Sequence, residues 1–100
     1  MRHSREIRFA PDHPTAAGHF PGNPIIPGAL LLDEVVRAMG LAGSAFVIRT
    51  TKFLEPVRPG QSVEVRWDAD GLATMKFECL LPDPERPAVV GTVQRLASEP

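Results

Sequence analysis

The chain has 100 residues, of which 43% are hydrophobic and 23% charged, a composition typical of a small globular domain rather than a disordered segment. Its formal net charge of −1 argues against bulk attraction to nucleic acid or to an anionic membrane. No apolar run approaches the roughly 20 residues of a membrane span, and the first residues lack the apolar stretch of a secretory signal. We therefore expect one domain over residues 1–100, located in the cytoplasm, with neither nucleic acid nor membrane as partner.

The chain begins with a pattern typical of a short, half-buried strand. Residues 5–9 alternate, with Ile7 and Phe9 on one side and charged residues on the other. A polar connection without periodicity follows up to Gly18. The same end of the chain carries three arginines that would form a local basic patch, available to an acidic partner: Arg2, Arg5 and Arg8.

Residues 18–28, which read GHFPGNPIIPG, form a stiff segment around one histidine. Three prolines fix φ and remove three N–H donors, and three glycines permit close backbone approaches. Such stiffness indicates that the position of His19 matters. The stiff segment runs directly into an apolar helix.

That helix is predicted over residues 28–39, with Gly40 as its stop signal. Apolar side chains take up most of its circumference, and only three polar residues interrupt them: Asp33, Glu34 and Arg37. A helix that is apolar nearly all round is expected to be buried, so other elements must wrap around it. A curved sheet would do so.

The remaining sequence supplies that sheet. Residues 58–60 read RPG, a sequence typical of a type II turn. Cys79 lies in an alternating segment, where we expect a buried, unreactive thiol. Consecutive strands with short connections indicate an antiparallel sheet with the helix on one face, hence the α+β class. The strands are predicted at residues 44–54, 62–67, 72–81 and 88–96, with a turn at 68–71 and a loop at 82–87.

Two residues stand out as chemistry-bearing. His19 lies close to a helix N-terminus, where unpaired N–H groups create a positive field able to hold a developing oxyanion on a thioester carbonyl. Neutral imidazole there could remove a proton α to that carbonyl. Asp33 follows 14 residues later, on an otherwise apolar helix. Its alternative role, an i,i+4 ion pair with Arg37, stays open at this stage.

The pattern HFPGxPxxPG over residues 19–28, followed by an acid at Asp33, resembles the signature of the 3-hydroxyacyl-[acyl-carrier-protein] dehydratases of fatty acid synthesis. The stretch KFLEPVRPG at residues 52–60 is similar to that family's strand and turn after the helix. The resemblance implies the hot-dog fold, in which a curled antiparallel sheet of about five strands wraps one long central helix.

The same resemblance implies roles for individual residues. His19 would take the C2 proton, and Asp33 would assist departure of the 3-hydroxyl as water. The backbone N–H of Gly28 would polarise the thioester carbonyl. The histidine and the acid would come from different subunits of a dimer and meet across a tunnel that holds the acyl-pantetheine arm of the substrate. Three further residues would line this tunnel: Phe20, Ile26 and Ala29.

The implied reaction uses no metal and no resident cofactor, because phosphopantetheine arrives as part of the substrate. The thioester carrier (acyl carrier protein or coenzyme A), the acyl chain length and the choice between a homodimer and a larger homo-oligomer remain open. Three other functions are compatible with parts of the sequence: an acyl thioesterase of the same fold, a non-catalytic acyl-binding module, and a polyproline ligand formed by residues 21–27.

Overall fold

A computed structural model describes residues 2–11, 25–68 and 73–96. These described residues form one helix and one sheet, as the sequence predicts. The sheet is antiparallel throughout, with strand order β1-β3-β4-β5-β2, so β1 and β2 are its edges. The elements in chain order are β1 (Arg2–Arg8), α1 (Gly28–Ala38), β2 (Phe46–Phe53), β3 (Ser62–Asp68), β4 (Thr74–Leu81) and β5 (Arg86–Arg95).

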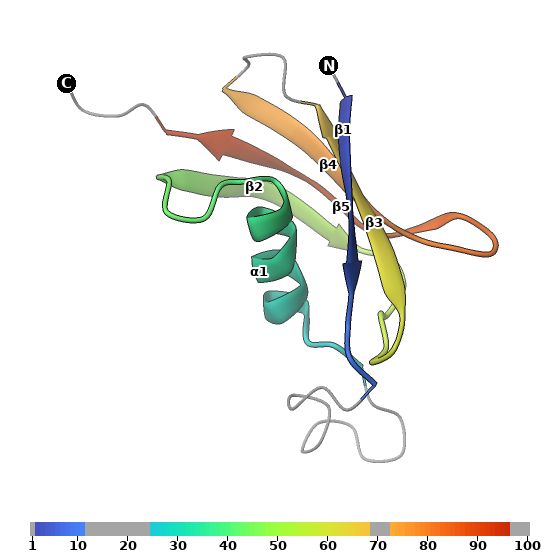
Figure 1. Ribbon diagram of the computed structural model, residues 1–100. Coiled ribbons are helices and arrows are strands. Elements are labelled where there is room, and N and C mark those ends of the chain that lie inside the picture. The colour runs from blue at the N-terminus through green and yellow to red at the C-terminus, as the bar shows by residue number, and fades with distance from the viewer. Residues whose placement is uncertain (1, 12–24, 69–72, 97–100) are drawn as a thin grey trace.

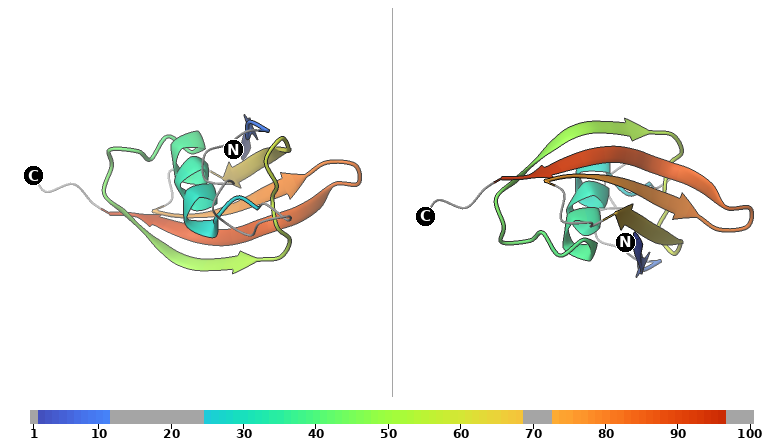
Figure 2. Two further views of the ribbon diagram at one scale, coloured as in Figure 1. Left: turned by 90° about the horizontal axis from the view of Figure 1, so that it is seen from below. Right: turned by 90° about the horizontal axis from the view of Figure 1, so that it is seen from above.

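The sheet curls around α1, which lies on its concave face (Figure 1). Viewed along the perpendicular direction, the helix covers one face of the sheet and leaves the other open (Figure 2). The two alternating stretches of sequence face the helix as predicted. Their side chains are buried in one hydrophobic core: Val63, Val65 and Trp67 of β3 with Met75, Phe77 and Cys79 of β4.

The expectation that α1 is buried nearly all round is wrong. Its core-facing side buries Leu31, Val35, Val36 and Ala38, but a stripe on another side is exposed. Residues spaced four apart lie on one helix face, so this stripe is continuous, and it consists of Ala29, Asp33 and Arg37. The physical reason is that a single sheet covers a helix from one side only.

The first strand differs from its predicted extent. It begins at Arg2 rather than Arg5, because the whole of β1 pairs with β3, starting with Arg2 opposite Asp68. Alternation along the strand places Arg5 on the opposite face from Arg2 and Arg8, so the three arginines do not form one patch. Arg2 instead lies within 3.8 Å of the Asp68 carboxylate.

One turn confirms its prediction from the sequence, and one predicted loop proves shorter than expected. Gly60 has φ +89° and the Gln61 N–H donates to the Arg58 carbonyl at 3.1 Å, which confirms the type II turn. The predicted loop 82–87 is shorter, because β5 already begins at Arg86, opposite Leu81 of β4. Most of the predicted turn at 68–71 lies outside the described residues.

Gly91 provides a test of the packing inside the sheet. It pairs with Phe77 across β4 and β5, and the Phe77 ring occupies the place of the missing side chain. A Cβ at this position would overlap the Thr50 carbonyl oxygen and come within 2.7 Å of the ring. We expect Gly91→Ala to lower the free energy of unfolding by about 1–3 kcal/mol, as overpacked cores do.

Urea denaturation followed by circular dichroism measures this effect. Lys76→Ala, an exposed position on the neighbouring strand, is the control and should change stability by less than about 0.5 kcal/mol. Equal stability of Gly91→Ala and the unmodified chain would contradict the described packing of β4 against β5.

Candidate functional site

The N-terminus of α1 is held by a short backbone anchor. The Ile26 N–H donates to the Val57 carbonyl at 2.7 Å, which ties the segment before the helix to the connection after β2. Pro27 precedes the helix without a side-chain cap, and the first intrahelical bond runs from the Leu31 N–H to the Pro27 carbonyl at 3.0 Å. The amides of the first turn, starting with Gly28, therefore have no intrahelical acceptor and remain available as donors.

An apolar pocket of about 470 Å³ opens beside this helix end. Glu55 is the one charged residue among the described residues that line it, and it accepts a hydrogen bond from Arg86 Nε at 2.7 Å, so the charge is already paired. Two of the predicted site residues, Ile26 and Gly28, belong to this pocket. Its lining consists of Ile25, Ile26, Gly28, Leu31, Phe53, Leu54, Glu55, Pro56 and Val57.

The other predicted site residues are not gathered in this pocket. His19 and Phe20 lie outside the described residues. Ala29 and Asp33 belong to the exposed stripe of α1, on another face from the pocket. Asp33 Oδ2 accepts from Arg37 Nε at 3.2 Å, so the ion pair that the sequence left open as an alternative is present.

The Asp33–Arg37 pair is a surface interaction. The Asp33 side chain is 53% exposed and the Arg37 side chain 65%, so the pair contributes little to stability. Only Oδ2 of the carboxylate is engaged, and Oδ1 has no partner among the described residues. Pairing with Arg37 and contact with a substrate are therefore compatible.

Sequence reasoning missed Phe53. The residue lies within the stretch that resembles the dehydratases, but its strand position gave no reason to connect it with Gly28. In the structure its ring lies against Gly28, and a Cβ built on that glycine would be 2.9 Å from Phe53 Cζ. An aromatic residue near the end of the strand predicted at residues 44–54 was the available signal.

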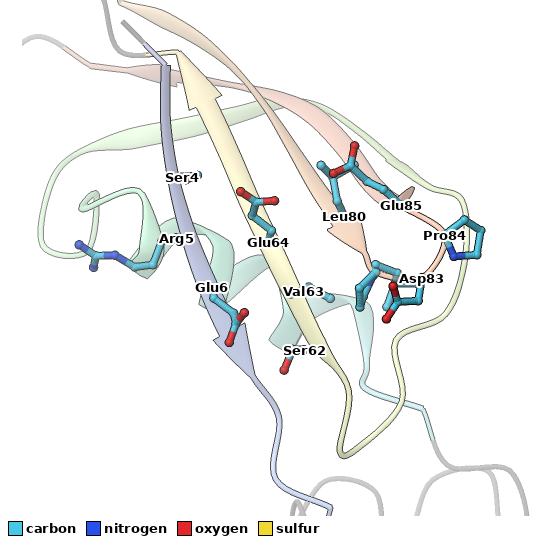
Figure 3. A pocket seen from close by; sticks show the side chains of 12 residues that line it. Ser4, Arg5, Glu6, Ser62, Val63, Glu64, Leu80, Asp83, Pro84 and Glu85 are labelled. Atoms are coloured by element: carbon cyan, nitrogen blue, oxygen red, sulfur yellow. The ribbon is translucent and has the colours of Figure 1, made fainter.

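A larger hollow, of about 640 Å³, lies between β1, β3 and the β4–β5 turn (Figure 3). Acidic side chains surround it, including Glu6, Glu64 and Glu85. Arg66 bonds to Glu64 at 2.8 Å and to Glu85 at 2.5 Å, and its hydrogen bond lowers the pKa of the Glu64 carboxyl. None of the predicted site residues that the structure describes lines this hollow, so it is not the candidate site.

The structure limits other kinds of chemistry. In the part of the chain that is described, no three His, Cys, Asp or Glu side chains gather in a way that could hold a metal ion. Cys79 is fully buried, as predicted, and burial raises the pKa of its thiol from 9.0 to about 12, so it is no nucleophile at neutral pH. The described helix is too short to cross a membrane.

The raised Cys79 pKa predicts a pH dependence of stability. Unfolding restores an ordinary thiol, which loses its proton near pH 9, whereas the folded thiol keeps its proton up to about pH 12. The stabilising contribution is therefore complete below pH 9 and is lost as pH rises towards 12. Between about pH 8 and about pH 10.5 the chain should lose about 1–2 kcal/mol more stability than Cys79→Ala.

Guanidinium titrations at the two pH values measure this difference. The chain contains no tyrosine, and both lysines, Lys52 and Lys76, are exposed, so few other groups contribute a structure-dependent change in this range. Parallel loss of stability in the two proteins would show that Cys79 is not buried as described.

Comparison with solved structures identifies the class of the protein. A crystal structure from Erwinia carotovora subsp. atroseptica is similar with a TM-score of 0.73 and 26% identity over 94% of this chain and 90% of the other. The dehydratase heterocomplex ApeI:P from Xenorhabdus doucetiae is similar with a TM-score of 0.76 and 24% sequence identity, and the match covers 96% of this chain and 88% of the other. An acyl-CoA hydrolase from Staphylococcus aureus shares the fold with a TM-score of 0.59 and 14% sequence identity, and the match covers 97% of this chain and 64% of the other. The architecture is the hot-dog fold, as the resemblance implied.

The family follows from the sequence match. Residues 2–90 match the model of the ApeI-like family, described as ApeI dehydratase, and the chain belongs to that family. Among curated proteins, the 3-hydroxyacyl-[acyl-carrier-protein] dehydratase FabZ of Wolbachia pipientis is 33% identical over 76 residues, 63% of this chain and 53% of its own. The FabZ of Haemophilus influenzae is 36% identical over 66 residues, which are 54% of this chain and 45% of the relative. The chain spans about half the length of these relatives.

Proposed function

We propose that this protein dehydrates 3-hydroxyacyl thioesters to trans-2-enoyl thioesters, with acyl carrier protein as the thioester carrier. Its membership of a dehydratase family supports the reaction type. The observation that carries the proposal is the apolar pocket beside the free amides of the first turn of α1. Such a pocket suits an acyl chain whose carbonyl oxygen is held by backbone donors.

In the proposed reaction, His19 removes the C2 proton, and the electron pair of that C–H bond becomes the C2=C3 double bond. The C3–O bond breaks, and Asp33 supplies a proton so that the hydroxyl leaves as water. The Gly28 N–H donates to the thioester carbonyl oxygen and stabilises the negative charge that develops there. Phosphopantetheine enters with the substrate, and the protein needs no cofactor of its own.

The proposed site is completed by a second copy of the chain. Asp33 lies on the exposed stripe of α1, whereas the pocket at Gly28 opens on another face, so one chain does not bring the two together. β2 pairs only with β5 and leaves its other edge open within the described sheet. A homodimer in which His19 of one copy faces Asp33 of the other would unite the parts.

The test is an assay of the purified chain with 3-hydroxyacyl thioesters of increasing length, each on acyl carrier protein and on coenzyme A. The expected result is new enoyl absorbance and a product lighter by one water, with faster turnover on the carrier protein. Release of free thiol without enoyl product would establish a thioesterase instead. Tight acyl binding without any product, at every chain length, would refute the enzyme and leave an acyl-binding module.

A further inference from the structure

We infer that Phe53 is the specificity-determining residue of the acyl pocket: its ring is a movable wall beside the Gly28 amide and limits the length of the acyl chain accepted. The inference rests on the proposed function, because it names what the pocket at Gly28 selects. It concerns a side chain that the proposed reaction does not use.

The exposure of Phe53 is unusual for its position. As the last residue of β2 it pairs with Val89 of β5, which is fully buried, so both side chains are on the helix-facing side of the sheet. Phe53 is nevertheless 53% exposed. The helix presents Gly28 at this point, which has no side chain to cover the ring.

Contact with Gly28 places the ring at the proposed thioester site. A Cβ on Gly28 would be 2.9 Å from Phe53 Cζ and 3.0 Å from Cε1, closer than side-chain atoms approach one another. These atoms are the far end of a side chain that can rotate about its χ angles. The ring therefore borders the amide that the carbonyl must reach, and it can swing away from it.

The backbone beneath the ring is fixed, so any movement is confined to the side chain. The N–H groups of Leu54 and Glu55 both donate to the Ala88 carbonyl, at 2.8 and 3.3 Å. The residues after Phe53 are thus tied to the start of β5. A change of the Phe53 side chain should alter the pocket without displacing the strand.

The lining of the pocket defines what it accepts. Apart from Glu55, whose carboxylate is paired with Arg86, every lining side chain that the structure describes is apolar. A phosphate-bearing arm would find no free cation among these residues, whereas a hydrocarbon chain would remove apolar surface from water on both sides. The pocket therefore suits the acyl chain rather than the phosphate end of the substrate.

The experiment compares kcat/KM for 3-hydroxydecanoyl and 3-hydroxybutyryl thioesters in the unmodified chain, Phe53→Leu and Phe53→Ala. Opening the wall should raise the ratio of long to short substrate about tenfold or more, the scale at which hydrophobic pockets discriminate chain length. Leu96→Ala is the matched control, since Leu96 is 43% exposed but lies outside the pocket, and it should keep the original ratio. Thermal unfolding verifies that each variant is folded.

A second variant tests the contact itself. Gly28→Ala should push the ring into the pocket and weaken binding of a non-reactive decanoyl-pantetheine amide, measured by calorimetry. Adding Phe53→Leu to Gly28→Ala should restore that binding. This readout does not require turnover, so it remains decisive if the unmodified chain dehydrates nothing and the proposed function fails. Folded Phe53 variants with an unchanged chain-length ratio, or unchanged decanoyl affinity in Gly28→Ala, would overturn the inference.

Discussion

Replacing His19 by alanine is expected to lower the rate of enoyl formation by about a hundred- to ten-thousandfold, the usual contribution of a positioned general base. Asp33→Asn should produce a loss of the same order, because the amide keeps the shape of the carboxylate but cannot supply the proton. Both rates are measured as enoyl absorbance from a 3-hydroxyacyl thioester at saturating concentration. Residual activity would come from the backbone donors and the pocket alone.

His3→Ala is the matched control for the histidine. His3 stacks on Trp67 with ring centroids 5.5 Å apart, at a distance in sequence and in the sheet from the pocket at Gly28, and its loss should leave turnover unchanged. Full activity of Asp33→Asn, with stability altered by only a few tenths of a kcal/mol, would assign Asp33 to its ion pair with Arg37 and to nothing more.

Mixing the two inactive variants should restore activity. If each site joins His19 of one copy to Asp33 of the other, a dimer of His19→Ala with Asp33→Asn contains one intact site and one doubly damaged site. After complete subunit exchange, half of the dimers are mixed, so activity should return to about a quarter of the unmodified level. Turnover is followed over time after mixing equal amounts of the purified variants.

The same mixture distinguishes the alternative geometry. If both residues acted within one chain, every site in every dimer would lack one group, and mixing would restore nothing. Light scattering on the unmodified protein supplies the control, since a strictly monomeric chain that still dehydrates its substrate would also contradict a shared site. Exchange is verified with a tagged copy captured together with an untagged one.

Much of the fold was predictable because it depends on local rules. The alternation in β3 and β4 required one buried face, and the structure buries Val65 and Phe77 as expected. The type II turn at Gly60 followed from its proline–glycine pair. The first strand was predicted too short, because residues 2–4 carry little β-forming pattern and are held by pairing with β3, a long-range contact.

The candidate site was predictable only in part. The motif at residues 19–28 and the acid at Asp33 were visible as spacing, and the family match agrees with the resemblance drawn from them. Spacing along a helix does not say which face the sheet covers. The exposure of Asp33 and its pairing with Arg37 therefore had to come from the structure.

The sequence by itself determined the class of fold, the apolar helix, the alternating strands and the family to which the chain belongs, since these depend on periodicity, turn chemistry and motif spacing. Only the tertiary structure decided that α1 keeps an exposed stripe and that Phe53 covers Gly28. The physical reason is that these features arise where distant segments meet. A glycine at a helix start leaves space, and only the packed sheet shows which side chain fills it.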